Sequence, residues 1–449
     1  MSFDFEAYFR QHDPTATWSI RPLTGGIVNL TVRAVRLPQD QSTRRGGQNE
    51  RQVLRGASKF SDHESLVLKY APPYVALVGE HAPFDRVRQG VEATALALFS
   101  SEGPLESLPV TSSVLVPRLI HHDEDSHILI IEDLGKLPPL SEYLSPSSPN
   151  ANQSRYQMML SDETFWRSSG RKPGHFFADL HSSSTIQAIT QYVGADDLPN
   201  FKNPSMIDMV RDAAVSTIKG YLDRHGITDS LHLSRVVEQD YERGISDEER
   251  CFIVGDLWPG GILIGNPESC TSVPKLGVID WEFSGPGRGI NGDMAQLLAH
   301  LHPYLLAAKF CQPDSPTHRA TLALIEGING SYQALSSMNG GTIWIQGSSN
   351  TSNPPDPLSP VARIFRSAVI LHGREIINNA IENDWSGLCG NGKEKDEMVR
   401  SLVQTGVQLL RLARSNAAEF AKEDNWKQLM SSTEARVIVG LFLGSDRLF

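Results

Sequence analysis

Two carboxylate clusters, each following an apolar run, are the residues of this sequence best suited to chemistry. Asp256 lies in the stretch VGDLWPGG, and Asp280 and Glu282 follow in LGVIDWEFSGPGRG, beginning 24 positions after Asp256. In phosphoryl transfer, one acid receives a hydroxyl proton and others hold magnesium on a nucleotide. The two clusters therefore predict phosphoryl-transfer chemistry.

The surroundings of Asp256 suit a catalytic base. An apolar run precedes it, and a Gly-Pro loop and a second apolar run follow it. A carboxylate held on both sides by rigid elements can orient a substrate hydroxyl and accept its proton. Asp, Pro and Gly are also the residues of an ordinary hairpin turn. This stretch alone leaves both interpretations open.

Asp280 and Glu282 have the spacing of a magnesium site. If the chain is extended there, alternation places both carboxylates on one face and Trp281 on the other. Two hard oxygen ligands suit magnesium, which keeps several waters and binds nucleotide phosphates. A strand-end turn with exposed acids is the alternative. Together with Asp256, the metal interpretation is preferred.

A third group of residues lies nearer the N-terminus. Gly25, Gly26 and Asn29 form a turn, Lys69 ends a strand, and Glu92 lies on the next expected helix. In this order an ion pair can steer a lysine onto the phosphates of a nucleotide. Taken singly, the lysine could protect a sheet edge and the glycines could form a plain turn. The series as a whole favours nucleotide binding.

The first part of the chain has the periodicity of strands. A hairpin, a further strand, a helix and two more strands are expected, at residues 18–23, 28–36, 66–70, 91–99, 114–120 and 128–132. Residues 38–63 are polar, with Phe60 as their one aromatic side chain, and are expected to be a solvated insertion.

A break at DLGKLPP predicts a boundary near Gly135, between a lobe at 1–135 and a lobe at 136–449. The backbone at Glu132 and Leu134 could pair with an adenine edge. Beyond the boundary helical patterns dominate, from residue 174 and at 205–226, 293–309, 361–383 and 398–417, with mobile loops expected at 145–155 and 337–360. The predicted fold is α+β and two-lobed, a small antiparallel sheet followed by a large helical lobe.

Composition excludes several classes of protein. The 449 residues include 41 basic and 52 acidic ones, and a net charge of −11 argues against a nucleic-acid partner. The four cysteines lack metal-binding spacing, so neither a zinc site nor a disulfide framework is expected. The expected location is therefore a reducing compartment. The N-terminus is too charged for a signal peptide, and no apolar run reaches the roughly 18 residues of a membrane span. A cytoplasmic location without membrane contact is expected.

The sequence resembles the aminoglycoside phosphotransferase and choline kinase superfamily, which has a protein-kinase-like fold. It is closest to the branch of the 5-methylthioribose kinases, which includes fungal 4-hydroxytryptamine kinase. The resemblance lies in a series of segments in the family's order over residues 20–300: LTGGIVNLTVRA, SLVLKYAPPYVA, VEATALALF, ILIIEDLGK, GDLWPGGILI, VIDWEFSGPG and GDMAQLL.

The resemblance implies ATP and Mg²⁺ as cofactors and a role for each candidate residue. Lys69 would contact the nucleotide phosphates with Glu92 as its partner, residues 131–135 would form the adenine hinge, and Asp256 would be the catalytic base. Asp280 and Glu282 would bind magnesium, and Asp293 would be a structural acid that caps the next helix.

Two positions depart from the family pattern. Val254 replaces a largely architectural His, and Gly261 replaces an Asn that binds the second metal. Methylthioribose kinases resemble this chain in lacking that Asn and in having an Asp-x-Glu motif, so Glu282 could supply the missing oxygen. The resemblance implies a kinase, and the two departures keep open a nucleotide-binding pseudoenzyme or scaffold.

The acceptor of such a kinase should be a small molecule. Ten residues separate Glu282 from Asp293, too few for the activation segment and peptide platform of protein kinases. The acceptor pocket is expected from residues 174–230 and 361–383. These stretches contain Asp179, His181, His372, Arg374 and Glu375, of which the two histidines are expected to be packed helix residues. Acids would suit an amine and Arg374 an anionic or sugar-like acceptor, and the sequence does not choose.

Overall fold

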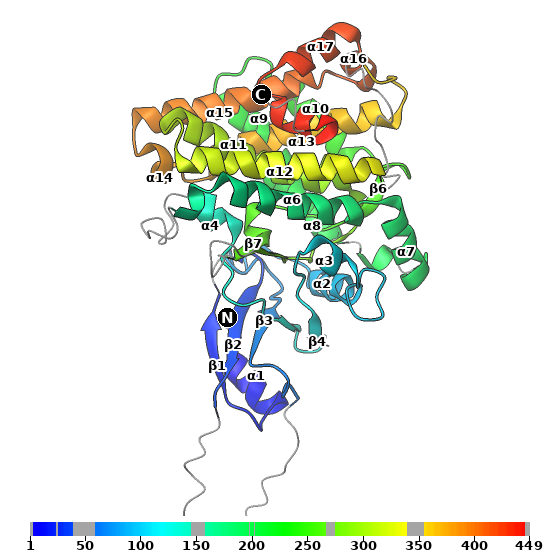
Figure 1. The fold of residues 1–449 in the computed structure, drawn as a ribbon, viewed down its shortest axis with the longest axis vertical. Coiled ribbons are helices and arrows are strands. Elements are labelled where there is room, and N and C mark those ends of the chain that lie inside the picture. The colour runs from blue at the N-terminus through cyan, green and yellow to red at the C-terminus, as the bar shows by residue number, and fades with distance from the viewer. Residues whose placement is uncertain are drawn as a thin grey trace, which may run out of the picture.

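The computed structural model describes residues 3–23, 26–38, 59–144, 158–196, 198–201, 203–265, 274–338 and 354–444. A small antiparallel sheet with few helices is followed by a much larger, mainly helical part (Figure 1). The α+β prediction is confirmed. Gly25, most of the polar insertion at 38–63, and most of the expected loops at 145–155 and 337–360 lie outside the described residues. The predicted boundary at residue 135 stays a prediction.

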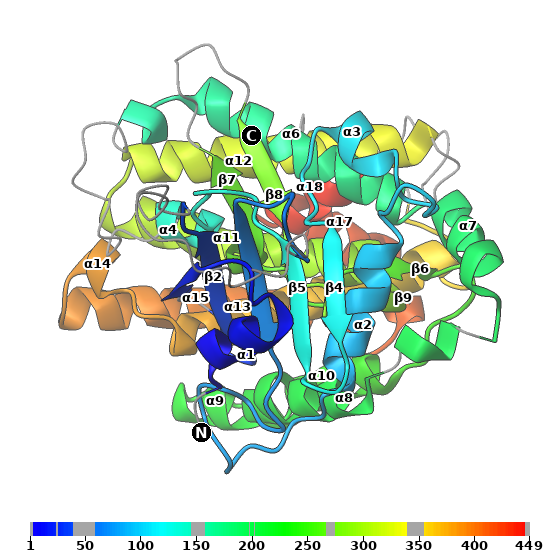
Figure 2. The same cartoon turned by 90° about the horizontal axis from the view of Figure 1, so that it is seen from below.

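The sheet has the strand order β1-β2-β3-β5-β4, and every neighbouring pair is antiparallel. Its strands are β1 (Trp18–Pro22), β2 (Leu30–Arg36), β3 (Ser65–Tyr70), β4 (Leu119–Asp123) and β5 (Ile128–Glu132). Helix α1 (Phe5–His12) lies across the sheet, and α2 (Val87–Ala97) lies beside β4 (Figure 2). A short helix, α3 (Leu108–Ser112), follows α2.

Alternation along β3 decides where its lysine points. Leu66 and Leu68 are fully buried in a cluster with the aromatic residues of α1. Val67 packs instead against the main core, which includes residues of α2 and the helical part. Side chains of a strand alternate between its faces, so Lys69 shares the face of Val67 and is directed toward α2.

The described part of the chain also contains two short two-stranded sheets. Strand β6 (Arg250–Ile253) pairs with β9 (Gly285–Arg288), and β7 (Ile262–Gly265) pairs with β8 (Lys275–Val278). The remaining helices are α4 (Leu140–Leu144), α6 (Glu163–Leu180), α7 (Ser183–Val193), α8 (Pro204–Val210), α9 (Thr217–Arg224), α10 (Ser230–Glu242), α11 (Ala295–Cys311), α12 (Pro316–Met338), α13 (Pro360–Glu382), α14 (Ser386–Cys389), α15 (Lys393–Leu412), α16 (Ala417–Phe420), α17 (Glu423–Ser431) and α18 (Arg436–Leu443).

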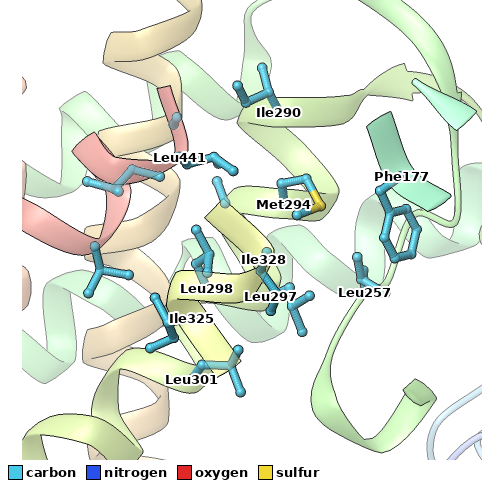
Figure 3. Packing of buried hydrophobic residues seen from close by; sticks show 14 of the residues in the cluster. Phe177, Leu257, Ile290, Met294, Leu297, Leu298, Leu301, Ile325, Ile328 and Leu441 are labelled. Atoms are coloured by element: carbon cyan, nitrogen blue, oxygen red, sulfur yellow. The ribbon is translucent and has the colours of Figure 1, made fainter. Parts of the chain in front are cut away.

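Helix α11 runs through the centre of the helical core. Leu297 and Leu298 of α11 and Met294 just before it are fully buried, and they pack near Ile325 and Ile328 of α12 (Figure 3). A helix that is apolar on every side is typical of a core position. None of the helices in the described part of the chain is both long and apolar enough to cross a membrane.

Several expected elements differ in the structure. The strand expected at 114–120 is wrong for most of its length, since β4 begins at Leu119. Pro117 lacks the N–H that a strand ladder requires, and Leu115 forms only an isolated bridge with Gly277. The helix expected at 205–226 is interrupted by a π-helical turn, η3 (Arg211–Val215). Residues 230–242 and 316–338 form helices that the periodicity analysis did not find.

The insertion is not solvated at its C-terminal end. Phe60 is buried, with 2% of its surface exposed, and its ring lies 6.3 Å from that of Phe9 and 6.5 Å from that of Trp18. The polar composition of residues 38–63 concealed this one aromatic anchor, which joins the cluster beneath α1.

The cysteine prediction also requires correction. Cys311 at the end of α11 and Cys389 in α14 form a disulfide, with 5.3 Å between their Cα atoms. Their separation of 78 residues gave no spacing signal, because only the fold brings the two helix ends together. Among the described residues, Cys251 is free and buried. The expectation of a chain without disulfides was therefore wrong.

Reduction of this disulfide should lower stability. Opening a cross-link between distant positions restores conformational entropy to the unfolded chain, and the expected loss is about 2–4 kcal/mol in the free energy of unfolding. Urea unfolding with and without reductant measures it. The variant Cys311→Ser/Cys389→Ser should not respond to reductant. Identical curves for the parent protein under both conditions would contradict the cross-link.

Candidate active site

Lys69 is the centre of a buried charge cluster. Its Nζ lies 2.7 Å from a carboxylate oxygen of Glu92 on α2 and 2.7 Å from Oδ1 of Asp280. Only 7% of the lysine side chain and 2% of the Glu92 side chain are exposed. Burial lowers the pKa of Lys69, but the charges of Asp280, Glu92 and Glu282 outweigh it and raise that pKa. Lys69 is therefore a fixed cation that joins the sheet to the helical part.

The turn before β2 contacts the same cluster. The side-chain amide of Asn29 donates to Oε2 of Glu282 at 2.7 Å and accepts from Nε of Arg88 at 3.1 Å. Arg88 is fully buried and also donates to the carbonyl of Val28 in the turn. Gly26 is exposed, and Gly25 is outside the described residues. The sequence analysis did not find Arg88, although it stands one helical turn before Glu92 on α2.

Asp280 and Glu282 contact or influence the cluster, but not through the alternating side chains of an extended strand. Asp280 has a φ of 66°, in the left-handed region, so the extended chain expected there is wrong. The fully buried Trp281 between the two acids donates from its indole to the carbonyl of Val278. The turn nevertheless directs both acids toward Lys69, which interacts electrostatically with each of them.

These two carboxylates have the chemistry of a magnesium site. Burial and the charges of Asp280 and Glu92 raise the pKa of Glu282 to about 7, against the opposing charge of Lys69. A divalent cation would relieve this crowding of negative charge, and hard oxygen ligands fit magnesium. In the part of the chain that the structure describes, no three His, Cys, Asp or Glu residues form a metal site by themselves. Two carboxylates completed by phosphates and waters satisfy magnesium.

Asp256 lies in a loop that crosses between the two small sheets. Because β6 pairs with β9 and β7 pairs with β8, the stretch is not an ordinary hairpin turn. Gly255 before it has a φ of 90°, and a Cβ there would lie 2.0 Å from the carbonyl oxygen of Phe283. Only glycine can occupy this position, and it sets the direction in which the chain presents Asp256.

The carboxylate of Asp256 is hydrogen-bonded and surrounded by other acids. Its Oδ1 accepts from the side-chain amide of Gln296 on α11 at 2.7 Å. Burial raises the pKa of Asp256 to about 6, Gln296 opposes the rise, and the charges of Asp280, Glu375 and Asp293 add to it. The charge of Asp280 therefore acts on Asp256 as well as on Lys69.

Asp293 holds the loop that carries Asp256. Its carboxylate accepts from the backbone N–H of Val254 at 2.8 Å and of Gly255 at 3.0 Å. The expected helix cap is wrong, because no side chain caps α11, which follows a π-helical turn, η5 (Gly289–Met294). His181, a packed residue as expected, lies with Nε2 3.4 Å from Asp293 and with Nδ1 3.0 Å from the hydroxyl of Tyr332. These contacts anchor the loop although Val254 replaces the family's histidine.

The segment after β5 lies where the two parts of the molecule meet. The N–H of Glu132 donates to the carbonyl of Arg118, and its carboxylate pairs with the Arg118 side chain. The side chain of Leu134 lies against Gly277 of β8, because a Cβ on that glycine would come within 2.9 Å of Leu134 Cδ1. Arg33 of β2 binds both Asp133 and the carbonyl of Gly135. The segment thus bridges the sheet and β8.

The expected acceptor side contains a neutralised pair. Arg374 donates to the carboxylate of Glu375, and both side chains are 9% exposed. His372 is fully buried, as expected for a packed residue, and its Nε2 lies 3.0 Å from Nδ1 of His302. Neither charge of the Arg374–Glu375 pair is free to select an acceptor by itself.

Sequence comparisons relate this chain to proteins named as small-molecule kinases. No family model matches the chain. It is 26% identical to 4-hydroxytryptamine kinase of Psilocybe cyanescens over 267 residues, 59% of this chain and 62% of that protein. It is 24% identical to methylthioribose kinase of Geobacillus thermodenitrificans over 386 residues, 83% of this chain and 86% of that protein. These similarities confirm the resemblance. The chain spans less than two thirds of the length of the 4-hydroxytryptamine kinases that it matches.

Solved structures with some likeness to this chain include two small-molecule phosphotransferases. Choline kinase from Cryptosporidium parvum has a TM-score of 0.39 and 11% identity, over 91% of this chain and 94% of that one. Spectinomycin phosphotransferase has a TM-score of 0.36 and 12% identity, over 91% of this chain and 97% of that one.

Alanine substitutions of two glycines in the Asp256 loop should differ in their effect on stability. Gly255→Ala should lower the free energy of unfolding by more than about 2 kcal/mol, because the new methyl group meets a backbone oxygen at a positive φ. Gly261→Ala should change it by less than about 1 kcal/mol, because the nearest atom to its Cβ is 3.5 Å away. Urea unfolding measures both. Equal losses for the two variants would contradict the loop conformation.

Neutralising Asp256 should stabilise the protein at high pH. The folded-state pKa of about 6 lies above the ordinary 3.8, so the ionised carboxylate costs stability above pH 6 and not below pH 3.8. Asp256→Asn should therefore raise the free energy of unfolding at pH 8 by about 1–3 kcal/mol, and the gain should fade as the pH falls toward 4. Denaturant unfolding at both pH values measures it. Asp125→Asn, at an exposed position, should show no such pattern. A pH-independent gain for Asp256→Asn would refute the shifted pKa.

Proposed function

We propose that this protein is an ATP-dependent kinase that transfers the γ-phosphoryl group to a hydroxyl of a small molecule. The observation that carries the proposal is the buried ion pair of Lys69 with Glu92, contacted by Asp280, whose charge also acts on Asp256. A strand lysine held by a helix glutamate is the phosphate-binding device of kinases. The relatives named as kinases support the same reaction class.

The residues of the sheet bind and orient the nucleotide in this proposal. Lys69 contacts its phosphates while Glu92 holds the ammonium group in place. The turn with Gly25, Gly26 and Asn29 covers the phosphates with backbone and amide groups. The backbone at Glu132 and Leu134 contacts the adenine edge.

Asp256 performs the proton transfer. One of its carboxylate oxygens accepts the proton of the acceptor hydroxyl as the new oxygen–phosphorus bond forms. The bond between the γ-phosphorus and the bridging oxygen breaks, and ADP leaves with that electron pair. A pKa of about 6 keeps Asp256 mostly ionised at neutral pH and close enough to it for efficient transfer.

Asp280 and Glu282 are the proposed magnesium ligands. When bound, magnesium supplies positive charge that neutralises the phosphate oxygens during transfer. Asp280, whose side chain is 34% exposed and contacts Lys69, would hold the metal through its carboxylate. Glu282 keeps Oε2 on Asn29, which leaves its second oxygen for the cation.

The acceptor is proposed to be a hydroxyl-bearing metabolite resembling the molecules named for the relatives, methylthioribose or hydroxytryptamine. Because Arg374 and Glu375 neutralise each other, the pair can accommodate a polar acceptor without demanding one sign of charge. This supports a small polar acceptor and leaves its identity to experiment.

Incubation with ATP, magnesium and a panel of methylthioribose, 4-hydroxytryptamine, choline and aminoglycosides tests the proposal. Mass spectrometry should find one product heavier by a phosphoryl group, with kcat/KM falling below pH about 6 as Asp256 takes up a proton. Asp256→Asn should lower kcat by about 100- to 10,000-fold, since it removes the base. The control Asp125→Asn should keep parent activity.

Full activity of Asp256→Asn would show that the base is assigned wrongly. Thermal stabilisation by ATP without magnesium, together with no transfer to any acceptor, would favour the nucleotide-binding pseudoenzyme.

A further inference from the structure

We infer that Gln296 of α11 is a positioning residue for Asp256, fixing one carboxylate oxygen so that the other faces the acceptor hydroxyl. The inference rests on the proposed function and adds a residue to which neither the comparisons nor the sequence pattern assigns a role. Its direct support is the hydrogen bond of 2.7 Å from Gln296 Nε2 to Asp256 Oδ1. A carboxylate only accepts hydrogen bonds, so the NH₂ group of the amide must be the one that faces it.

The residues around Gln296 are all fixed in place. Three positions earlier, Asp293 binds the backbone of Val254 and Gly255, so the start of α11 and the Asp256 loop are joined. The carbonyl of Ala295 lies 3.3 Å from Nδ1 of His372. Because that carbonyl can only accept, Nδ1 carries a proton and donates to it.

The hydrophobic core and a second contact with the Asp256 loop also hold α11 in place. Met294, Leu297 and Leu298 are fully buried on either side of Gln296 (Figure 3). One turn further along α11, the ring of His300 lies 6.4 Å from that of Trp258, two residues after Asp256. The helix therefore cannot rotate or slide without breaking these contacts, and the amide reaches Asp256 from a rigid base.

In this arrangement the two carboxylate oxygens of Asp256 have different roles. The bond to Gln296 occupies Oδ1, which leaves Oδ2 to accept the hydroxyl proton. The largest charge effects that disfavour the ionised form of Asp256 come from the acids Asp280, Glu375 and Asp293, of which Glu375 is paired with Arg374 and Asp280 with Lys69. Gln296 is thus the group that favours the ionised, proton-accepting carboxylate within an acidic surrounding.

Gln296→Met, which keeps side-chain length and removes the donor, tests the inference. It should lower kcat by roughly 10- to 100-fold, leave the KM for ATP within twofold of the parent value, and move the acid limb of the kcat/KM profile to higher pH. The matched control is Gln312→Met at the other end of α11, where the amide donates to the carbonyl of Leu388. The control should keep the parent kcat and pH profile even if its thermal stability falls.

A second measurement does not depend on activity. At pH 8, Gln296→Met should lower the melting temperature by about 2–4 °C, because an ionised carboxylate loses its donor. In an Asp256→Ala background the same substitution should have less than half of that effect.

The outcomes separate the inference from the proposed function. A Gln296→Met enzyme with parent kcat and pH profile overturns the positioning role and leaves the kinase proposal intact. Equal drops in melting temperature in both backgrounds overturn the contact itself. If the parent protein transfers no phosphoryl group, the kinase proposal fails. The comparison of melting temperatures in the parent and Asp256→Ala backgrounds then decides by itself whether Gln296 acts on Asp256.

Discussion

The ion pair between Lys69 and Glu92, with Asp280 as the second partner of the lysine, is the interaction on which the site depends. It joins a strand, a helix and the loop after β8, which come from distant parts of the chain. Charges buried this deeply are stable only when they are paired, and removal of one partner leaves another uncompensated. The pair therefore fixes how the sheet meets the helical part, and it holds in place the cation that the proposal assigns to the nucleotide phosphates.

A second constraint is the excess of acidic side chains around Lys69 and Asp256. The charges of Asp280 and Asp293 act on Asp256, the charge of Asp280 also acts on Glu282, and the four acids tolerate this repulsion in two ways. Asp293 is satisfied by two backbone N–H groups, and Asp280 by Lys69. Asp256 and Glu282 have raised pKa values instead. An acid held by backbone N–H groups, as Asp293 is, suits a scaffold role, and groups with pKa values near neutrality suit proton transfer and metal binding.

The sequence predicted the residue types of the site better than its geometry. Strand and helix periodicity placed Lys69 on β3 and Glu92 on α2, because local patterns determine both elements. The predicted conformation at Asp280 and the predicted helix-capping role of Asp293 were wrong. A positive φ and a hydrogen bond to a distant backbone leave no local pattern in the sequence. Gln296 and the Cys311–Cys389 pair depend on where α11 packs, which only long-range contacts decide. Polar composition likewise concealed the burial of Phe60.

A crystal structure with a nonhydrolysable ATP analogue and magnesium tests the central claim most directly. The account predicts that Lys69 keeps its contact with Glu92 and binds the phosphates, while Asp280 leaves the lysine and binds the metal. Asp256 should then lie on the side of the terminal phosphate away from the bridging oxygen. A nucleotide bound elsewhere, with the 2.7 Å contact between Lys69 and Asp280 unchanged, would contradict it.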